Sequence, residues 1–148
     1  ALLIIEHFGG TEVHFIREKE TCFPRDFLAL AKVIGTEKAA ILAREYPDVN
    51  FIIPHLGSFA DDWRAQLALI DHLVRHPNIH ADTSGVRRFD LLAEAVRRAG
   101  AHKILFGSDG PWLHPGVELA KIHALGLKAA DAALVLGGNL LRLIGRDR

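Results

Sequence analysis

Short apolar runs recur along the chain, separated by longer stretches in which apolar and polar residues follow a helical period. The runs at 2–5, 49–53 and 103–106 are almost continuously apolar, and a weaker run covers 78–82. Continuous apolar character over a few residues is typical of parallel strands that are buried on both faces. We therefore expect four strands in a parallel sheet.

Helices are predicted between and after these runs. Thr36 is a suitable N-cap for the first of them, and the second has apolar residues spaced by about 3.6 positions and stops before Pro77. The expected helices cover 36–46, 61–75, 90–99, 116–125 and 129–144. Residues 8–35 are predicted to be a long loop, in which 27–34 are compatible with a helix. Strands that alternate with helices indicate an α/β fold with right-handed crossovers.

Composition narrows the class of protein. Lys+Arg and Asp+Glu balance at 18 each, so the chain has no net basic field to attract nucleic acid or an anionic membrane. Hydrophobic residues make up 49% of the chain, enough for a sizeable core, and no apolar run approaches the ~20 residues of a membrane span. Cys22 is the only cysteine, which excludes an intrachain disulfide. We expect a cytoplasmic protein that binds a small-molecule substrate and neither nucleic acid nor membrane.

Three of the predicted strands are followed closely by a residue that can bind a metal ion. His7 follows the first strand, His55 the second and Asp109 the last. In a parallel barrel all strands end on the face where active sites are built, so these side chains are expected to converge. Imidazole nitrogen and carboxylate oxygen both suit Zn²⁺. Ser58 and Ser84 have no adjacent His–Asp arrangement in the sequence, and we predict no serine nucleophile.

Four segments, in order, resemble motifs of the amidohydrolase-related family, the group that includes aminocarboxymuconate semialdehyde decarboxylase and related decarboxylases and lactone hydrolases. The segment 47–57 (PDVNFIIPHLG) is similar to the family's strand-six motif, and 106–112 (FGSDGPW) to its strand-eight motif. The segment 81–85 (ADTSG) matches the usual end of strand seven, and 137–145 (GGNLLRLIG) resembles the C-terminal helix signature. The resemblance extends over nearly the whole chain.

The resemblance implies the C-terminal half of a TIM barrel, strands five to eight, as one partial domain over residues 1–148. A complete barrel needs roughly 250 residues, and this chain has 148. By position His7 resembles the strand-five metal ligand, and His55 resembles the strand-six histidine beside the metal-bound water. Asp109 resembles the strand-eight residue that acts as a metal ligand or as a catalytic acid or base. The implied cofactor is a divalent metal, Zn²⁺ or else Mn²⁺. The His-X-His pair that completes the family's site has no counterpart here.

The expected activity is metal-dependent hydrolysis or non-oxidative decarboxylation of a small carboxylated or cyclic substrate, with an active site that this chain holds only in part. The alternative is a truncated barrel module that binds a partner or ligand without catalysis. Half a barrel leaves two sheet edges, expected at 2–5 and 103–106, and unpaired apolar edges associate. We therefore expect either a homodimer or pairing with the missing N-terminal half.

Each candidate residue also has a simpler interpretation. His7 and His55 could be turn or core residues, and Asp109 could cap the N-terminus of the next helix. Trp112, close to Asp109 in the sequence, could line a substrate pocket. Trp63 is expected to pack a helix onto the barrel.

Overall fold

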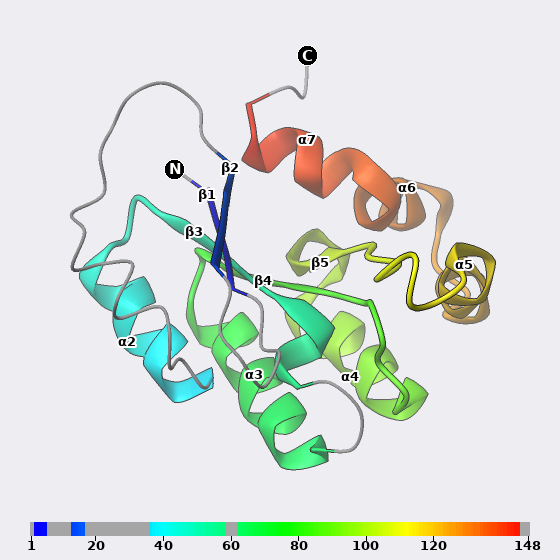
Figure 1. The fold of residues 1–148 in the computed structure, drawn as a ribbon, viewed down its shortest axis with the longest axis horizontal. Helices are drawn as coiled ribbons and strands as arrows, with labels where there is room; N and C mark the ends of the chain where they lie inside the picture. Colours follow the sequence, from blue (N-terminus) through cyan, green and yellow to red (C-terminus); the bar gives the residue numbers. More distant parts are fainter. Residues whose placement is uncertain (1, 6–12, 17–35, 59–61, 146–148) are drawn as a thin grey trace.

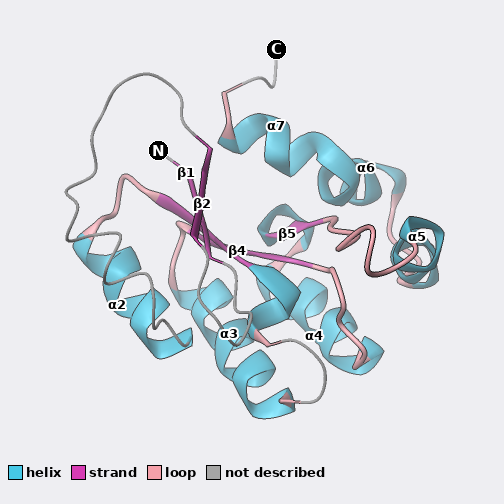
Figure 2. Ribbon diagram, in the orientation of Figure 1, coloured by secondary structure: helices cyan, strands magenta, loops and turns pink. Residues whose placement is uncertain are grey.

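The computed structural model describes residues 2–5, 13–16, 36–58 and 62–145. Within these ranges the chain forms a sheet covered by helices (Figures 1 and 2). The strands are β1 (Leu2–Ile5), β2 (Val13–Ile16), β3 (Asn50–Ile53), β4 (Ile79–Asp82) and β5 (Ile104–Leu105). The helices are α2 (Thr36–Glu45), α3 (Trp63–Arg75), α4 (Phe89–Ala99), α5 (Pro115–Ala124), α6 (Ala129–Ala133) and α7 (Asn139–Leu143). Short helical segments complete the list: η2 (Pro54–Gly57), η3 (Ala101–Lys103) and η4 (Leu134–Gly138).

The sheet has the order β2-β1-β3-β4-β5. Strands β1, β3, β4 and β5 run parallel, as the alternation of strands and helices predicts, and each neighbouring pair is in register over two or three residues. Helices α2, α3 and α4 lie side by side along one face of this sheet (Figure 1). The predicted α/β fold with parallel strands is confirmed for the described residues.

Strand β2 corrects the prediction of a long loop over residues 8–35. It pairs antiparallel with β1, with His14 opposite Ile4, so the free sheet edge predicted at 2–5 is wrong. The run Val13–Ile16 has strand-forming residues but is short and interrupted by a histidine, which made its pattern weak. At the other end β5 is the last strand of the described sheet, as predicted. The possible helix at 27–34 lies outside the described residues.

The main core lies between the sheet and α2, α3 and α4. Phe51 and Ile53 of β3 are buried in it, whereas Ile52 belongs to a second cluster with Leu105 on the opposite face. Successive strand residues point to opposite faces of a sheet, which explains this division. In β4 the residues of the main core are Ile79 and Ala81, so Asp82 points to the opposite face, as its strand neighbour Leu105 does. Asp82 is therefore on the side of the sheet that faces away from α2, α3 and α4.

The turn after β3 requires a glycine. Gly57 has a φ of +96°, and a Cβ there would lie 2.9 Å from the Cβ of Leu69 in α3 and 3.0 Å from the Cγ2 of Thr36 in α2. The absence of a side chain allows both helices to approach the turn closely. The following helix begins two residues later than predicted, with the side chain of Asp62 accepting a hydrogen bond from the backbone N–H of Ala65.

The C-terminal helix predicted over 129–144 is interrupted. The segment η4 separates α6 from α7, and Gly137 within it departs from helical geometry. The backbone N–H of Phe106, just after β5, donates to the carbonyl oxygen of Val135 in η4, 2.8 Å away. Asn139 is fully buried, and its side-chain amide donates to the carbonyl oxygens of Ala101 and Ile104. These bonds attach the C-terminal helices to the end of the sheet.

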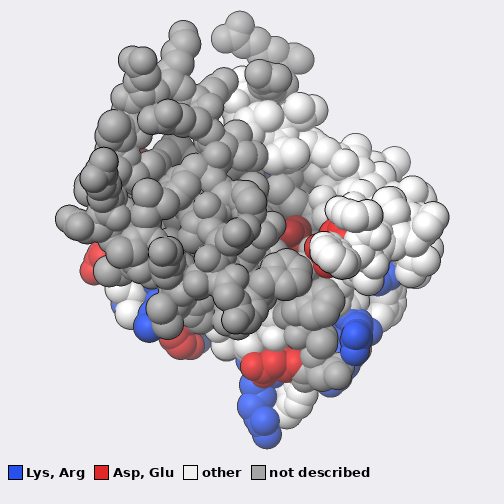
Figure 3. All heavy atoms as spheres, in the orientation of Figure 1, with Lys and Arg blue, Asp and Glu red and all other residues white. Residues whose placement is uncertain are grey.

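Charged side chains of both signs occur together among the described residues. On the face that Figure 3 shows, Lys and Arg alternate with Asp and Glu along the lower rim. Arg97 pairs with Glu94, and Arg98 pairs with Asp71. None of the helices in the described ranges combines the length and apolar character that a membrane crossing needs.

Candidate active site

The end of β3 holds His55 in an unusual backbone conformation. His55 and Leu56 have φ values of 57° and 52°, in the left-handed region that side chains other than glycine rarely adopt. Both residues are buried, Leu56 completely. The backbone N–H of His55 donates to Oδ1 of Asp82, 2.9 Å away. The turn is thus fixed by core packing on one side and by a carboxylate at the end of β4 on the other.

The imidazole ring of His55 is oriented by Ser84. Its Nδ1 lies 2.8 Å from the backbone carbonyl oxygen of Ser84 and 3.0 Å from the Ser84 hydroxyl oxygen. A carbonyl oxygen only accepts hydrogen bonds, so Nδ1 carries a proton. Nε2 is therefore the ring nitrogen of this tautomer that can accept a proton.

The Ser84 hydroxyl connects the ring to a carboxylate. It donates to Oδ1 of Asp82, 2.7 Å away, and accepts from Nδ1 of His55. The sequence shows no histidine and aspartate arranged around Ser84, but the fold brings His55 and Asp82 into contact with its hydroxyl. The order of the bonds nevertheless differs from a hydrolytic triad, in which the histidine takes the serine proton. Here the serine proton points to Asp82, so Ser84 is a link between His55 and Asp82 and not an activated nucleophile.

Asp82 is the residue that the sequence reasoning missed. Its Oδ1 accepts hydrogen bonds from the backbone N–H groups of His55 and Ser84 and from the Ser84 hydroxyl. Burial raises the pKa of the Asp82 carboxyl, while these bonds and the proximity of His55 act in the opposite direction. The signal in the sequence is its position as the final residue of a strand, close to the positions that His55 and Asp109 take relative to their own strands.

The end of β5 packs against the same group of residues. A Cβ on Gly107 would lie 3.1 Å from the Cγ of Asp82 and 3.1 Å from the Cβ of Ser84, so the lack of a side chain permits the approach. The backbone N–H of Gly107 also donates to the hydroxyl of Thr83, 3.2 Å away. The segment that leads to Asp109 therefore lies directly beside the residues that hold His55, at one edge of the sheet.

Asp109 has the features of a ligand and not of a helix cap. Helix α5 begins at Pro115, and its N-cap is His114, whose ring accepts from the backbone N–H of Gly116. The alternative interpretation of Asp109 as an N-cap is therefore wrong. Its backbone is in the left-handed region, with a φ of 51°. Its Oδ2 is buried and has no hydrogen-bond partner among the described residues. A buried carboxylate oxygen without a partner is costly unless a cation or a proton satisfies it.

The unpaired Oδ2 of Asp109 fits a metal ligand, because carboxylate oxygen binds both Zn²⁺ and Mn²⁺. Within the described ranges no group of three or more His, Cys, Asp or Glu side chains is arranged to hold a metal ion. His7, the other predicted ligand, lies outside the described residues. The described part of the chain thus contributes one suitable ligand, Asp109, together with His55, which follows a strand of the same sheet.

The two tryptophans are both exposed. Trp63 is 41% exposed, with the Arg64 guanidinium 4.7 Å from the centre of its ring, so the expectation that it packs a helix onto the barrel is wrong. The hydrophobic face of α3 is formed by other residues, and Trp63 sits at the helix start. Trp112 is 81% exposed, three residues after Asp109. Its contact with substrate stays a prediction.

Comparison with solved structures gives matches over three quarters of the chain, while no curated protein matches. A dihydroxybenzoic acid decarboxylase from Polaromonas, with bound manganese and the inhibitor 2-nitroresorcinol, is 21% identical, with a TM-score of 0.56 over 76% of this chain and 41% of its own. An amidohydrolase from Burkholderia multivorans with bound zinc is 18% identical, with a TM-score of 0.63 over 74% and 49%. A putative 2-pyrone-4,6-dicarboxylic acid hydrolase from Pseudomonas putida is 18% identical, with a TM-score of 0.58 over 77% of this chain and 50% of its own.

This chain thus spans half or less of the length of each of these neighbours, with which it shares a fold. The family model described as amidohydrolase matches residues 12–146, which include every described residue of the site. The match covers most of the chain, and the chain belongs to the amidohydrolase family.

Proposed function

We propose that the protein is a metal-dependent hydrolase or decarboxylase that acts on a small carboxylated or cyclic substrate. The observation that carries the proposal is the presence of two groups with suitable chemistry after parallel strands of the same sheet. His55 has a ring fixed through Nδ1, and Asp109 has a buried carboxylate oxygen without a partner. The neighbouring structures named as decarboxylase and hydrolase support this class of activity.

His55 is proposed as the group that moves a proton at Nε2. A ring held by hydrogen bonds from Nδ1 presents its other nitrogen in one direction, which general acid–base catalysis requires. In decarboxylation the proton would go to the carbon that loses CO₂, and in hydrolysis it would come from the attacking water. The Ser84 hydroxyl and the Asp82 carboxylate stabilise the ring while it is charged.

Asp109 is proposed as a metal ligand through Oδ2, and His7 as a second one. A divalent ion, when bound, polarises a substrate oxygen and lowers the pKa of water toward neutrality. Zinc and manganese are the ions found in the neighbouring structures. Trp112 is proposed to contact the substrate, since an exposed aromatic ring close to Asp109 can close over a bound ligand.

We also propose that β1, β3, β4 and β5 correspond to strands five to eight of a TIM barrel. Their parallel order supports this assignment. The residues of this chain then form one partial domain, and the remaining ligands come from the other half of the barrel or from a second copy of the chain. The alternative, a module that binds a partner without catalysis, predicts neither metal nor turnover.

The test is metal content and turnover of the purified protein and of Asp109→Asn, supplied with Zn²⁺ or Mn²⁺. Two substrates are chosen from the neighbours: 2,6-dihydroxybenzoate, the carboxylate analogue of 2-nitroresorcinol, and 2-pyrone-4,6-dicarboxylate. In the protein alone or together with a candidate N-terminal half, we expect stoichiometric metal and release of product from one substrate, both reduced by about a hundredfold in Asp109→Asn. The matched control is Asp90→Asn, which neutralises an exposed carboxylate paired with Arg88.

Two results would count against the proposal. Full metal content and turnover in Asp109→Asn would show that this carboxylate is not a metal ligand. A folded protein without metal and without turnover, both alone and together with a candidate N-terminal half, would support the non-catalytic module.

A further inference from the structure

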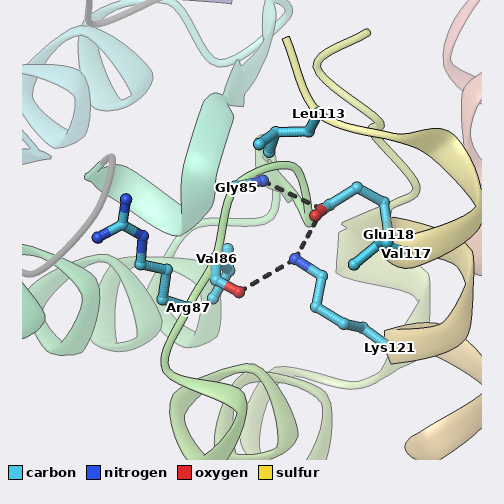
Figure 4. A pocket seen from close by; sticks show the side chains of 7 residues that line it. All are labelled: Gly85, Val86, Arg87, Leu113, Val117, Glu118 and Lys121. Atoms are coloured by element: carbon cyan, nitrogen blue, oxygen red, sulfur yellow. Dashed lines mark hydrogen bonds and ion pairs between the residues drawn. The ribbon is translucent and has the colours of Figure 1, made fainter.

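Helix α5 carries a buried ion pair that faces the loop after β4. The Lys121 ammonium lies 2.6 Å from Oε2 of Glu118, one helical turn away, and the two side chains are 18% and 5% exposed. Figure 4 shows both side chains reaching from the helix toward Gly85 and Val86. The cavity beside them has a volume of about 320 Å³. The pair is directed at the backbone of this loop.

The Lys121 ammonium and one carboxylate oxygen of Glu118 both bind the loop. The Lys121 ammonium donates to the carbonyl oxygens of Thr83 and Val86, 3.1 and 3.0 Å away. Oε2 of Glu118 accepts from the backbone N–H of Gly85, 3.1 Å away. Three hydrogen bonds to charged groups thus fix the segment 83–86, which contains the serine that orients His55.

One peptide group links Glu118 to His55. The peptide bond between Ser84 and Gly85 is planar, and its N–H and C=O groups move as one unit. Its N–H donates to Glu118, and its carbonyl oxygen accepts from Nδ1 of His55. Hydrogen bonds in such a chain polarise and strengthen one another. The orientation of this peptide plane therefore sets the position of the His55 ring.

We propose that Glu118 and Lys121 are positioning residues for His55, acting through the Ser84–Gly85 peptide group. The inference rests on the proposed role of His55 as the proton-moving group. Burial of an ion pair costs desolvation free energy, and apolar residues can attach a helix at least as well. What this pair supplies, and apolar packing cannot, is a fixed orientation of one peptide plane.

The test uses NMR at constant pH on protein with ¹⁵N-labelled backbone and histidine. It measures the chemical shift of the Nδ1–H of His55 and the hydrogen-exchange rate of the Gly85 amide. We expect Lys121→Met to speed exchange of the Gly85 amide by about tenfold or more and to shift or abolish the Nδ1–H signal of His55. Glu118→Gln keeps the shape of the side chain and replaces a charged acceptor with a neutral one. It should move both signals in the direction of weaker hydrogen bonds, and it carries the test if Lys121→Met does not fold.

The matched control is Lys103→Met. The ammonium of Lys103 is also buried and donates to three backbone carbonyls, those of His76, Pro77 and Ile79, at the opposite ends of the strands. We expect this variant to melt at a lower temperature with both signals unchanged. Unchanged signals in Lys121→Met and Glu118→Gln, or equal shifts in Lys103→Met, would overturn the inference. These signals do not depend on turnover, so their outcome is separate from that of the proposed function.

Discussion

The strained backbone of His55 is the feature of the site that needs most support from its surroundings. A left-handed conformation costs about 1–2 kcal/mol for a residue with a side chain, and both His55 and Leu56 adopt it. The Asp82 carboxylate accepts the backbone N–H of His55 and, through the Ser84 hydroxyl, is connected to its ring. One carboxylate thus stabilises both the backbone and the side chain of the proposed acid–base group.

Asp82→Asn separates this role from a general contribution to stability. The amide keeps the shape of the carboxylate but is a weaker, neutral acceptor. The hydrogen bonds that fix the backbone and the ring of His55 therefore become weaker. Hydrogen bonds to charged groups are worth roughly 1.5–3 kcal/mol, and we expect turnover to fall by about tenfold to a hundredfold. The melting temperature should change little, because removal of a buried charge also relieves its desolvation cost. Steady-state kinetics and thermal melts check both expectations, and unchanged turnover would remove Asp82 from the site.

The sequence predicted the candidate site residues that follow strands, His55 and Asp109. It did not predict that Asp82 and Ser84 bind His55. His55 and Asp109 come directly after apolar runs, which is a pattern visible along the chain. Ser84 lies 29 residues from His55 and Asp82 lies 27 residues from it, so their contacts exist only once β3 and β4 are paired. Contacts of this kind follow from strand register, which local patterns do not specify.

The ends of β4 and β5 approach each other closely. Gly107 has no side chain, and this allows the segment that carries Asp109 to pack against Asp82 and Ser84. The two halves of the proposed site, the histidine with its supports and the metal-binding carboxylate, are therefore joined by a contact between neighbouring strands. Their relative position depends on one small residue.

Gly107→Ala tests this contact. A methyl group 3.1 Å from the Cγ of Asp82 and the Cβ of Ser84 is tighter than normal packing, so these side chains must shift by a few tenths of an ångström. Overpacking of this kind costs typically about 1–3 kcal/mol, and we expect that loss in the free energy of unfolding. Gly137→Ala is the control, because no atom lies within 4 Å of a Cβ placed there. Urea denaturation measures both variants, and equal stability of the two would contradict the proposed crowding.

The accuracy of the predicted elements follows the strength of their periodicity. Helices α2, α3 and α4 begin and end within two residues of their predicted limits, because each buries one regular face. Strand β2 was missed because four residues carry too little pattern, and its pairing with β1 depends on tertiary contact. The break at η4 also escaped prediction, since the apolar run over 134–136 continues across it.

The molecule as a whole has two chemically different ends. The strands end near the proposed site, whereas basic groups lie at the opposite end, where His80 and Lys103 are buried, His76 is half-buried and His102 is exposed. Burial, together with the nearby charges of Lys103 and Arg142, lowers the pKa of His80 from 6.5 to about 3. Burial is also the main reason why the pKa of Lys103 falls to about 8. Protonation of its histidines therefore lowers the stability of this end of the fold.

The shifted pKa of His80 predicts loss of stability in acid. As the pH falls below 6.5, the unfolded chain takes up a proton that the folded chain cannot accept until about pH 3, so the free energy of unfolding decreases through that window. The lowered pKa values of His76 and His102 act in the same direction, whereas the raised pKa of the Asp82 carboxyl acts in the opposite one. Between about pH 7 and about pH 4.5, His80 alone should account for about 2–3 kcal/mol.

His80→Gln isolates this contribution, because an amide side chain does not titrate in the window. Urea denaturation of both proteins at a series of pH values should show a markedly flatter pH dependence in the variant, whatever its absolute stability. The buried Nδ1 of His80, which has no hydrogen-bond partner among the described residues, is consistent with a ring that stays neutral in the fold. Parallel pH profiles for the two proteins would mean that His80 is protonated in the native state, and that the acid sensitivity of the fold arises elsewhere.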